Sequence, residues 1–306
     1  MEFYGDLHCD TIWKCYRHQS DLEDPTLEVK RHPPFKHLQT YAVYIPDGTK
    51  DPHEYFLAAH TYGEEVMRRY PDMHLCFNGK EIDETFSAGK TPYIYSVEGG
   101  GFFGEDMLKN EQIAIDLKKR GVAFISLCYN KGNHLAGGIE VEFGMSALGK
   151  KVALMLRDMG LTVDISHLNH RSADQMLELL PDHVVATHSN CYALKDHPRN
   201  LTDGQIKELI HRKGLMGVNF CHYFLSAPED AKILDLIDHF RHILKLGGES
   251  IAAIGGDFDG ISCTPSDLPD LYAVKDLGSA LEKEFGTALA DRILYGNMKD
   301  YIDRVL

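Results

Sequence analysis

The chain has 306 residues and a formal net charge of −14 at pH 7, from 46 acidic and 32 basic side chains. This excess of acid argues against binding to nucleic acid or to an anionic membrane surface, because both need a basic face. No secretory signal and no apolar run long enough to span a bilayer is visible. The seven cysteines form no Cys-x-x-Cys pair, so we expect reduced thiols and a cytoplasmic protein.

Short β-branched or aromatic runs alternate with longer segments of helical periodicity along the whole chain. We expect strands at 2–7, 40–45, 93–97, 123–129, 162–166, 184–187, 215–220 and 252–256. We expect helices at 54–69, 112–120, 146–159, 172–179, 202–211 and 231–246, with one or two closing helices after Gly286.

This alternation is typical of parallel sheets built from strand–helix–strand units. The number of strands predicts an α/β fold of the closed (β/α)8 or TIM-barrel type, with its functional groups at the carboxyl ends of the strands. An open doubly wound sheet is the alternative, but it more often carries a Gly-rich loop after its first strand, and none follows here. No linker or repeat divides the chain, so we expect one barrel domain over residues 1–306.

Five of the apolar runs end on histidine or carboxylate side chains. The residues at these ends are His8 with Asp10, Glu98, His167, His188 and Asp257. One such ending is more often structural than functional, but five on parallel strands predict a single polar mouth. Imidazole and carboxylate ligands without thiolate suit zinc, and also manganese or cobalt. The number of ligands exceeds the needs of one open tetrahedral site and favours two metals that share a carboxylate and a hydroxide.

Side-chain alternation refines this prediction at two of the strand ends. His8 and Asp10 are two positions apart, so both should face the mouth while Cys9 faces away. Asp257 and Asp259 have the same spacing, and one of them could carry a proton to and from a metal-bound water. We favour Asp257 for this chemistry and Asp259 for a supporting role, although Asp-Gly at 259–260 also fits a plain turn.

Arg199 lies in the segment His-Pro-Arg-Asn at 197–200, shortly after His188. A fixed guanidinium at this place could hold a substrate carboxylate through two parallel hydrogen bonds. Without its neighbours, the same arginine would be read as an ordinary surface residue.

These segments resemble the membrane (renal) dipeptidase family, peptidase family M19, in order and spacing over essentially the whole chain. The matching stretches are Asp-Leu-His-Cys-Asp at 6–10, Val-Glu-Gly-Gly at 97–100, Val-Asp-Ile-Ser-His at 163–167, Thr-His-Ser-Asn at 187–190, Arg-Asn-Leu at 199–201 and Gly-Gly-Asp-Phe-Asp-Gly at 255–260. The resemblance implies hydrolysis of small dipeptides, with D-residues accepted at the C-terminal position, by a hydroxide between two zinc ions. Homodimers are common in the family, so we also expect a homodimer.

The resemblance assigns a role to each candidate residue. It implies that His8 and Asp10 bind one zinc, that His167 and His188 bind the other, and that Glu98 bridges them. It implies that Arg199 holds the C-terminal carboxylate of the dipeptide and that Asp257 transfers the proton.

One position departs from the family pattern. Animal members carry a histidine after the fourth strand, near the developing oxyanion, and here Tyr129 takes that place as a substrate-binding residue. A phenol donates a hydrogen bond but carries no positive charge at neutral pH. Asn130 or His134 are alternatives for that role. Two other functions stay open: a metal-dependent hydrolase of another small or cyclic amide, and a barrel that binds without catalysis.

Overall fold

The computed structural model describes residues 1–225 and 230–306. Its strands are β1 (Phe3–Cys9), β2 (Lys36–Tyr44), β3 (Met73–Leu75), β4 (Thr91–Glu98), β5 (Val122–Ser126), β6 (Thr162–Asp164), β7 (Val184–Val185), β8 (Met216–Val218) and β9 (Ala252–Ile254). Its α-helices are α1 (Thr11–His18), α2 (Pro52–Met67), α3 (Gly79–Ser87), α4 (Met107–Lys119), α5 (Ala147–Asp158), α6 (His170–Leu179), α7 (Asp203–His211), α8 (Ile233–Lys245), α9 (Val274–Phe285), α10 (Thr287–Asp291) and α11 (Asn297–Val305). None of the helices in this part of the chain is long and apolar enough to cross a membrane.

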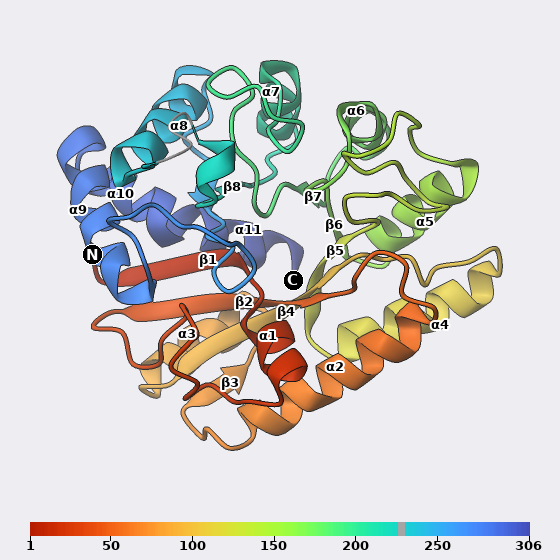
Figure 1. Cartoon of the computed structure of the whole chain (residues 1–306), viewed down its shortest axis with the longest axis horizontal. Coiled ribbons are helices and arrows are strands. Elements are labelled where there is room, and N and C mark those ends of the chain that lie inside the picture. Colours follow the sequence, from red (N-terminus) through yellow and green to blue (C-terminus); the bar gives the residue numbers. More distant parts are fainter. Residues whose placement is uncertain (226–229) are drawn as a thin grey trace.

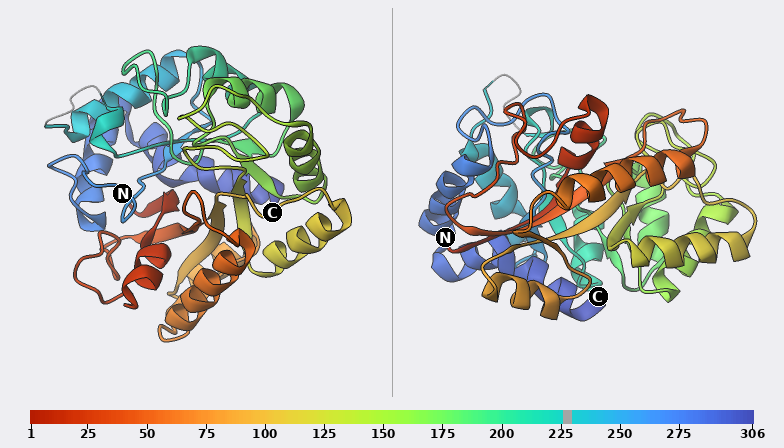
Figure 2. Two further views of the ribbon diagram at one scale, coloured as in Figure 1. Left: turned by 45° about the vertical axis from the view of Figure 1, so that its right-hand side comes forward. Right: turned by 90° about the horizontal axis from the view of Figure 1, so that it is seen from below.

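The strands form one parallel sheet in the order β7-β6-β5-β4-β2-β1-β9-β8, with β3 paired to β4 outside this path. The two ends of the order meet where Ala186, just after β7, bridges Met216 of β8. There the amide of Ala186 donates to the carbonyl of Leu215 at 2.8 Å. Helices surround the strands on the outside (Figures 1 and 2). The prediction of a (β/α)8 barrel is therefore confirmed.

Four elements were not predicted, namely the short α1, α3 and β3 and the 12-residue α9, which precedes the closing helices expected after Gly286. α1 and α3 make about two helical turns each, which is too little sequence for a clear apolar period. β3 has three residues and none of them is buried. The fourth helix also begins earlier than its predicted start at 112, because the carboxylate of Asp106 accepts from the amide of Lys109 and caps the first turn of α4.

Several strands end sooner than their apolar runs. β6, for example, stops at Asp164, although the apolar run continues to 166. Beyond the strands the backbone turns left-handed at His167 (φ 70°), Asp257 (φ 61°) and Asp259 (φ 67°). This conformation is uncommon for residues with a Cβ atom, and hydrophobic patterns do not indicate it. The turns at His167 and Asp257 bring these two side chains into the mouth of the barrel.

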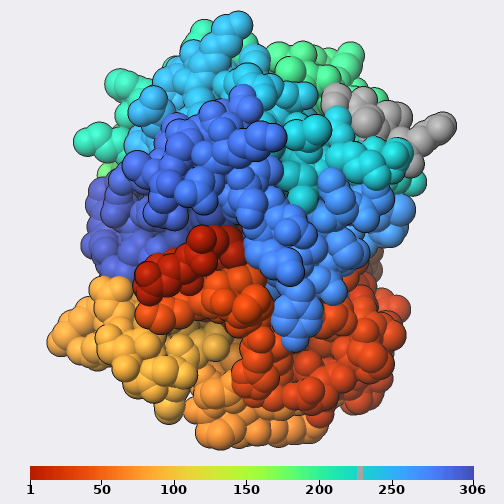
Figure 3. Space-filling model, turned by 90° about the vertical axis from the view of Figure 1, so that its left-hand side faces the viewer, coloured from red at the N-terminus to blue at the C-terminus, as the bar shows by residue number. Residues whose placement is uncertain are grey.

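The amino end of the barrel is closed by aromatic packing. The ring of Phe3, at the start of β1, lies 5.4 Å from that of Phe86 in α3 and stacks on that of Tyr295 at 5.1 Å. Figure 3 shows the N-terminal residues between the segment that contains α3 and the C-terminal helices. The expected closing helices thus lie opposite the end where the predicted site residues gather.

Candidate metal centre and active site

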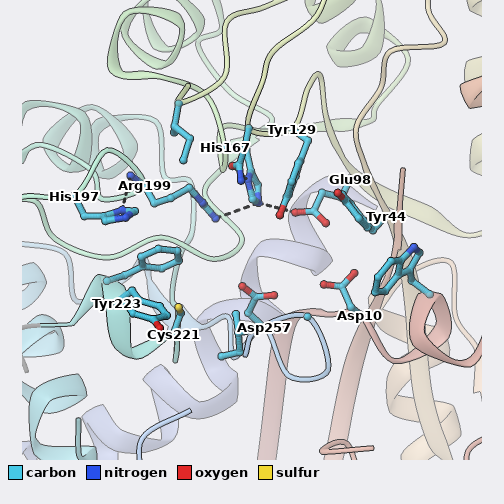
Figure 4. Close-up of a pocket in the computed structure, with 16 residues that line it drawn as sticks. Asp10, Tyr44, Glu98, Tyr129, His167, His197, Arg199, Cys221, Tyr223 and Asp257 are labelled. Atoms are coloured by element: carbon cyan, nitrogen blue, oxygen red, sulfur yellow. Dashed lines mark hydrogen bonds and ion pairs between the residues drawn. The ribbon is translucent and has the colours of Figure 1, made fainter. Parts of the chain in front are cut away.

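A pocket of about 470 Å³ opens at the carboxyl ends of the strands. Six of the eight predicted site residues line it, namely Asp10, Glu98, Tyr129, His167, Arg199 and Asp257 (Figure 4). His8 and His188 lie beneath them, almost fully buried, with their rings 3.8 Å apart. The fold therefore brings together every residue that the strand-end pattern singled out.

Glu98, the last residue of β4, stands between two groups of imidazoles. Its Oε1 atom is 2.6 Å from Nε2 of His167 and 3.5 Å from Nε2 of His188. Its Oε2 atom lies on the other side, 3.9 Å from Nε2 of His8. The two oxygens of one carboxylate thus face two separate sets of ligand atoms.

The second set is centred on His8. Its Nε2 atom lies 3.6 Å from Oδ2 of Asp10 and 3.8 Å from Oδ1 of Asp257. Within the described chain, Nε2 of His8 and Oδ1 of Asp10 are buried without a hydrogen-bond partner. His8 and Asp10 share a face as predicted, while Cys9 packs in the core. Buried polar atoms left unpaired in this way suit a bound cation.

The two histidines of the first set have their tautomers fixed by neighbours. The hydroxyl of Thr187 donates to Asp164, and its oxygen then accepts from Nδ1–H of His188 at 2.7 Å. Nδ1–H of His167 donates to Oδ1 of Asn130 at 2.8 Å. Each Nε2 atom is therefore left with a lone pair toward the pocket, the form in which imidazole binds metals.

Burial and nearby positive charge keep these two rings neutral. Burial lowers the pKa of His167 well below its usual value, and Arg199 and His8 lower it further. The pKa of His188 is lowered by burial and by the same two charges. Nη2 of Arg199 lies 3.2 Å from Nε2 of His167 and donates toward it. Neutral imidazole is the state that a divalent metal requires.

Three carboxyl groups, those of Asp10, Glu98 and Asp257, are crowded into the rest of the site. Burial, and then the charge of Asp10, raises the pKa of Glu98. Burial raises the pKa of Asp257 to about 7. Burial alone would lower the pKa of His8, but Asp10, Glu98 and Asp257 outweigh it and raise that pKa to about 10. The raised pKa values of Glu98 and Asp257 show that carboxylates crowd one another in a buried site, and a divalent cation bound among them would relieve this repulsion.

Ligand atoms from these residues are close enough to act together. Those of His8, Glu98 and His188 all lie within 4.8 Å of one another, and so do those of His8, Asp10 and Asp257. The donors are imidazole nitrogens and carboxylate oxygens, the set that binds zinc and similar divalent metals. The residues present therefore fit a metal centre.

The prediction that Asp257 and Asp259 share a face is wrong. Asp257 points into the pocket, where its Oδ2 atom accepts from Nδ2 of Asn219 at 2.8 Å. Asp259 points away and accepts from the hydroxyl of Thr11 at 2.6 Å and from Nζ of Lys14 at 3.1 Å. Strand alternation fails here because both aspartates have left-handed backbones. Asp259 instead ties its loop to α1, in agreement with a supporting role.

Arg199 is buried, and its Nη2 atom also donates to the carbonyl of His188 at 3.1 Å. Figure 4 shows Arg199 and Glu98 approaching His167 from opposite sides. Arg199 is thus an internal residue with its charge beside the metal ligands, and the alternative of an ordinary surface arginine is wrong.

Tyr129 and its two alternatives have different surroundings. The ring of Tyr129 lies 4.4 Å from that of His167 and lines the pocket. Asn130 binds His167 instead of pointing free into the pocket. His134 contacts the carbonyl of Phe103 at 2.7 Å and does not line this pocket. Tyr129 and Asn130 therefore both line the pocket, but the amide oxygen of Asn130 is taken up by His167.

Sequence reasoning missed the residues that hold the site residues in place. Asp164 and Thr187 fall inside the segments that matched the family, so their position next to His167 and His188 was a usable signal. Asn219 follows β8 and gave no signal, since an asparagine after a strand is common in loops.

A parallel barrel whose strand ends gather histidines and carboxylates around a buried site has the arrangement of a metal-dependent hydrolase. The family model of membrane dipeptidase, peptidase family M19, matches residues 4–300. The chain belongs to this family and is a metallo-dipeptidase by classification.

Two relatives show how far the sequence similarity extends. An uncharacterised dipeptidase of the fission yeast Schizosaccharomyces pombe is 34% identical over 166 residues, which are 51% of this chain and 40% of that protein. An uncharacterised Klebsiella pneumoniae protein from the 5′ region of pqqA is 28% identical over 239 residues, or 74% of this chain and 86% of that protein. The match therefore spans less than half of the yeast protein and most of the bacterial one.

Solved structures share the fold over the full length. A family M19 metallopeptidase described as dipeptidase AC has a TM-score of 0.89 at 20% identity and covers 99% of this chain and 98% of its own. A Rhodobacter sphaeroides metallopeptidase, liganded with a phosphinate mimic of L-Ala-D-Ala, also has a TM-score of 0.89 at 20% identity, with 100% and 99% coverage. At this identity the similarity establishes the fold alone.

Proposed function

We propose that this chain is a binuclear zinc dipeptidase that hydrolyses the peptide bond of small dipeptides. The observation that carries the proposal is the position of Glu98, whose Oε1 faces His167 and His188 while its Oε2 faces His8. A carboxylate with ligand sets on both of its oxygens is suited to bridge two metals.

In this proposal His8 and Asp10 hold one zinc, His167 and His188 hold the other, and Glu98 joins the two sites. When bound, the two ions supply acidified water near neutral pH and polarise the substrate carbonyl. Asn130 and the pair Thr187–Asp164 orient the two imidazoles through hydrogen bonds to Nδ1. Such outer contacts support metal affinity.

Substrate positioning falls to Arg199. Its buried guanidinium would bind the free carboxylate of the dipeptide, which places the scissile bond beside Glu98 and limits substrates to those with an exposed C-terminus. Tyr129 would contact the same substrate from the facing side of the pocket, as a neutral group.

Proton transfer falls to Asp257. Its side chain lines the pocket, and Asn219 fixes one of its oxygens at 2.8 Å. As the water oxygen bonds to the scissile carbon, Asp257 takes a proton from it. When the C–N bond breaks, the same carboxyl returns the proton to the leaving amine. Burial and Asp10 raise the pKa of Asp257 to about 7, which is suited to both steps.

The finer parts of the proposal concern the accepted dipeptides, the cellular location and the assembly of the chain. The Rhodobacter sphaeroides relative was solved with a mimic of L-Ala-D-Ala, and we include dipeptides with a C-terminal D-residue among the substrates. The cysteines are all unpaired in the described chain, which supports a cytoplasmic site of action. We further propose that residues 1–306 act as one domain and that two chains form a homodimer.

The test is hydrolysis of a panel of L-Xaa–L-Xaa and L-Xaa–D-Xaa dipeptides, combined with metal analysis of the same sample. We expect two zinc ions per chain and turnover that a chelator abolishes and zinc restores. A sample with full metal content that cleaves no dipeptide would contradict the proposal. Turnover of cyclic amides alone would favour a different amide hydrolase on the same barrel.

A further inference from the structure

One side of the catalytic pocket is a continuous row of aromatic rings. Trp13 of α1 contacts Tyr44 of β2 at 5.2 Å between ring centroids, Tyr44 contacts Tyr129 at 4.6 Å, and Tyr129 contacts His167 at 4.4 Å. All four residues line the pocket. We call this row, Trp13–Tyr44–Tyr129–His167, the aromatic wall.

The two ends of the wall are anchored. The indole N–H of Trp13 donates to the hydroxyl of Tyr55 in α2 at 3.0 Å, and His167 is held by Asn130 at 2.8 Å. Tyr129 lies between the ring of Tyr44, which packs on the anchored Trp13, and the ring of His167. Its ring is therefore a fixed part of the pocket surface, since turning it would break both ring contacts.

A second pocket of about 300 Å³ lies behind the wall. Its lining includes Asp47, Lys50, Gly99, Gly101 and His134, which come from the loops after β2, β4 and β5. Tyr129 also lines it, and among the described residues it is the one that lines both pockets. Tyr129 thus lies at the boundary between the catalytic pocket and this second pocket.

The orientation proposed for the substrate determines which of its ends faces Tyr129. Figure 4 shows Arg199 on one side of His167, and Glu98 and Tyr44 on the other. A dipeptide whose carboxylate is bound at Arg199 and whose scissile bond lies at Glu98 directs its N-terminal residue toward the wall. A third residue on the N-terminal side would be directed toward Tyr129 and the second pocket that adjoins it.

We propose that Tyr129 determines substrate length, because its ring blocks the passage from the catalytic pocket into the second pocket. The inference rests on the proposed dipeptidase function. The second pocket is large enough to accept a further residue, since small-molecule sites begin at roughly 300 Å³. It also offers a group for a peptide ammonium, because Asp47 is a carboxylate that the amide of Lys131 holds in place at 3.1 Å.

The test compares kcat/KM for a tripeptide with kcat/KM for the dipeptide made of its two C-terminal residues. Wild type should strongly prefer the dipeptide. In Tyr129→Ala the tripeptide-to-dipeptide ratio should rise by about tenfold or more, as expected when a blocked site is opened to a larger substrate. Mass spectrometry should show release of the C-terminal residue and a dipeptide as first products.

Tyr129→Phe is the matched control, because it keeps the ring and removes the hydroxyl, and its ratio should stay near that of wild type. Tyr129→Leu shortens the wall with less loss of packing and should raise the ratio if the alanine variant does not fold. Adding Asp47→Asn to Tyr129→Ala should reduce the gained tripeptide activity, since it removes the negative charge that would face the N-terminal ammonium of the tripeptide.

The outcomes separate the two proposals. If wild type cleaves no dipeptide with metal bound, the proposed function fails. If wild type and the shortened variants all cleave dipeptides and the ratio does not change, the substrate-length role of Tyr129 is wrong. An equal rise of the tripeptide-to-dipeptide ratio in Tyr129→Phe and in Tyr129→Ala would also overturn this role, because the hydroxyl and not the ring would then exclude the tripeptide.

Discussion

Nε2 of His167 lies 2.8 Å from Nε2 of His188. Hydrogen bonds at both Nδ1 atoms place the ring protons away from this contact, so two lone pairs face each other in a buried site. Such a contact is unfavourable unless a cation lies against both nitrogens. The fold therefore holds these ligand atoms together at a cost in stability, which a metal bound to both nitrogens would offset.

Metal removal should consequently destabilise the protein as well as inactivate it. A ligand present at 100 times its Kd stabilises the native state by about 2.7 kcal/mol, so excess zinc should raise the melting temperature of the chelated protein by several degrees. Differential scanning calorimetry measures this shift. His188→Ala should lose most of the response, whereas His18→Asn, at an exposed position, should keep it. An equal response in His188→Ala would contradict this prediction.

The contact between Thr187 and His188 should control metal affinity without touching the metal. Thr187→Val removes the hydroxyl that accepts from Nδ1 of His188, and zinc affinity should fall about 10- to 100-fold. Competition with a zinc indicator measures the change. Thr162→Val is a matched control, since Thr162 is also buried but contacts Tyr301 elsewhere in the barrel. Unchanged affinity in Thr187→Val would show that the hydroxyl does not orient the ligand.

Asp257 has two possible roles, because its Oδ1 atom lies 3.8 Å from the ligand atom of His8. If it carries the proton, Asp257→Asn should lower kcat by roughly 100- to 10,000-fold while two metals per chain remain bound. Asparagine preserves an oxygen for the contact with Asn219. Metal analysis beside the rate separates the roles, since loss of one metal from the variant would identify Asp257 as a ligand.

Arg199 should govern the recognition of the free C-terminus. Replacing a buried guanidinium that pairs with a carboxylate costs several kcal/mol, so Arg199→Met should lower kcat/KM for dipeptides roughly 100-fold or more. The decisive measurement uses the same dipeptide with an amidated C-terminus. Wild type should discriminate strongly between acid and amide, and the variant should treat them nearly alike. Retained discrimination in the variant would mean that another group binds the carboxylate.

Stability should fall in acid because of a histidine far from the metal centre. Burial lowers the pKa of His239 to about 4, and its Nδ1 atom accepts from the amide of Cys191 at 3.0 Å. In the unfolded chain the pKa of a histidine is about 6.5, so the unfolded state binds a proton at a higher pH than the folded state does. The free energy of unfolding therefore decreases as pH falls from about 6.5 to 4, by about 1.4 kcal/mol per pH unit.

His239→Asn should flatten this acid slope, because the amide oxygen still accepts from Cys191 but does not titrate. Urea unfolding at pH 7 and pH 5 measures it, with metal removed by a chelator in every sample. His74→Asn, at an exposed position, should keep the wild-type slope. An unchanged slope in His239→Asn would assign the acid sensitivity to other groups.

Apolar periodicity was sufficient to predict the class of fold and to group the residues at the barrel mouth. Alternating apolar periods specify strands and helices locally, and parallel strands place their carboxyl ends at one edge whatever their distance in the chain. His8, Glu98 and His188 could therefore be grouped before any contact between them was known. The same rule placed His8 and Asp10 on one face, because β1 is extended up to Cys9.

The way in which these groups face one another could not be predicted and became visible in the folded chain. The divergence of Asp257 from Asp259 arises from left-handed backbone that leaves no trace in an apolar pattern. The support of His188 by Asp164, and the second pocket behind Tyr129, join loops that are far apart in the sequence. Periodicity reports which face of a strand is buried. The distances and the spaces between loops arise from packing among all of them, and no local pattern encodes that.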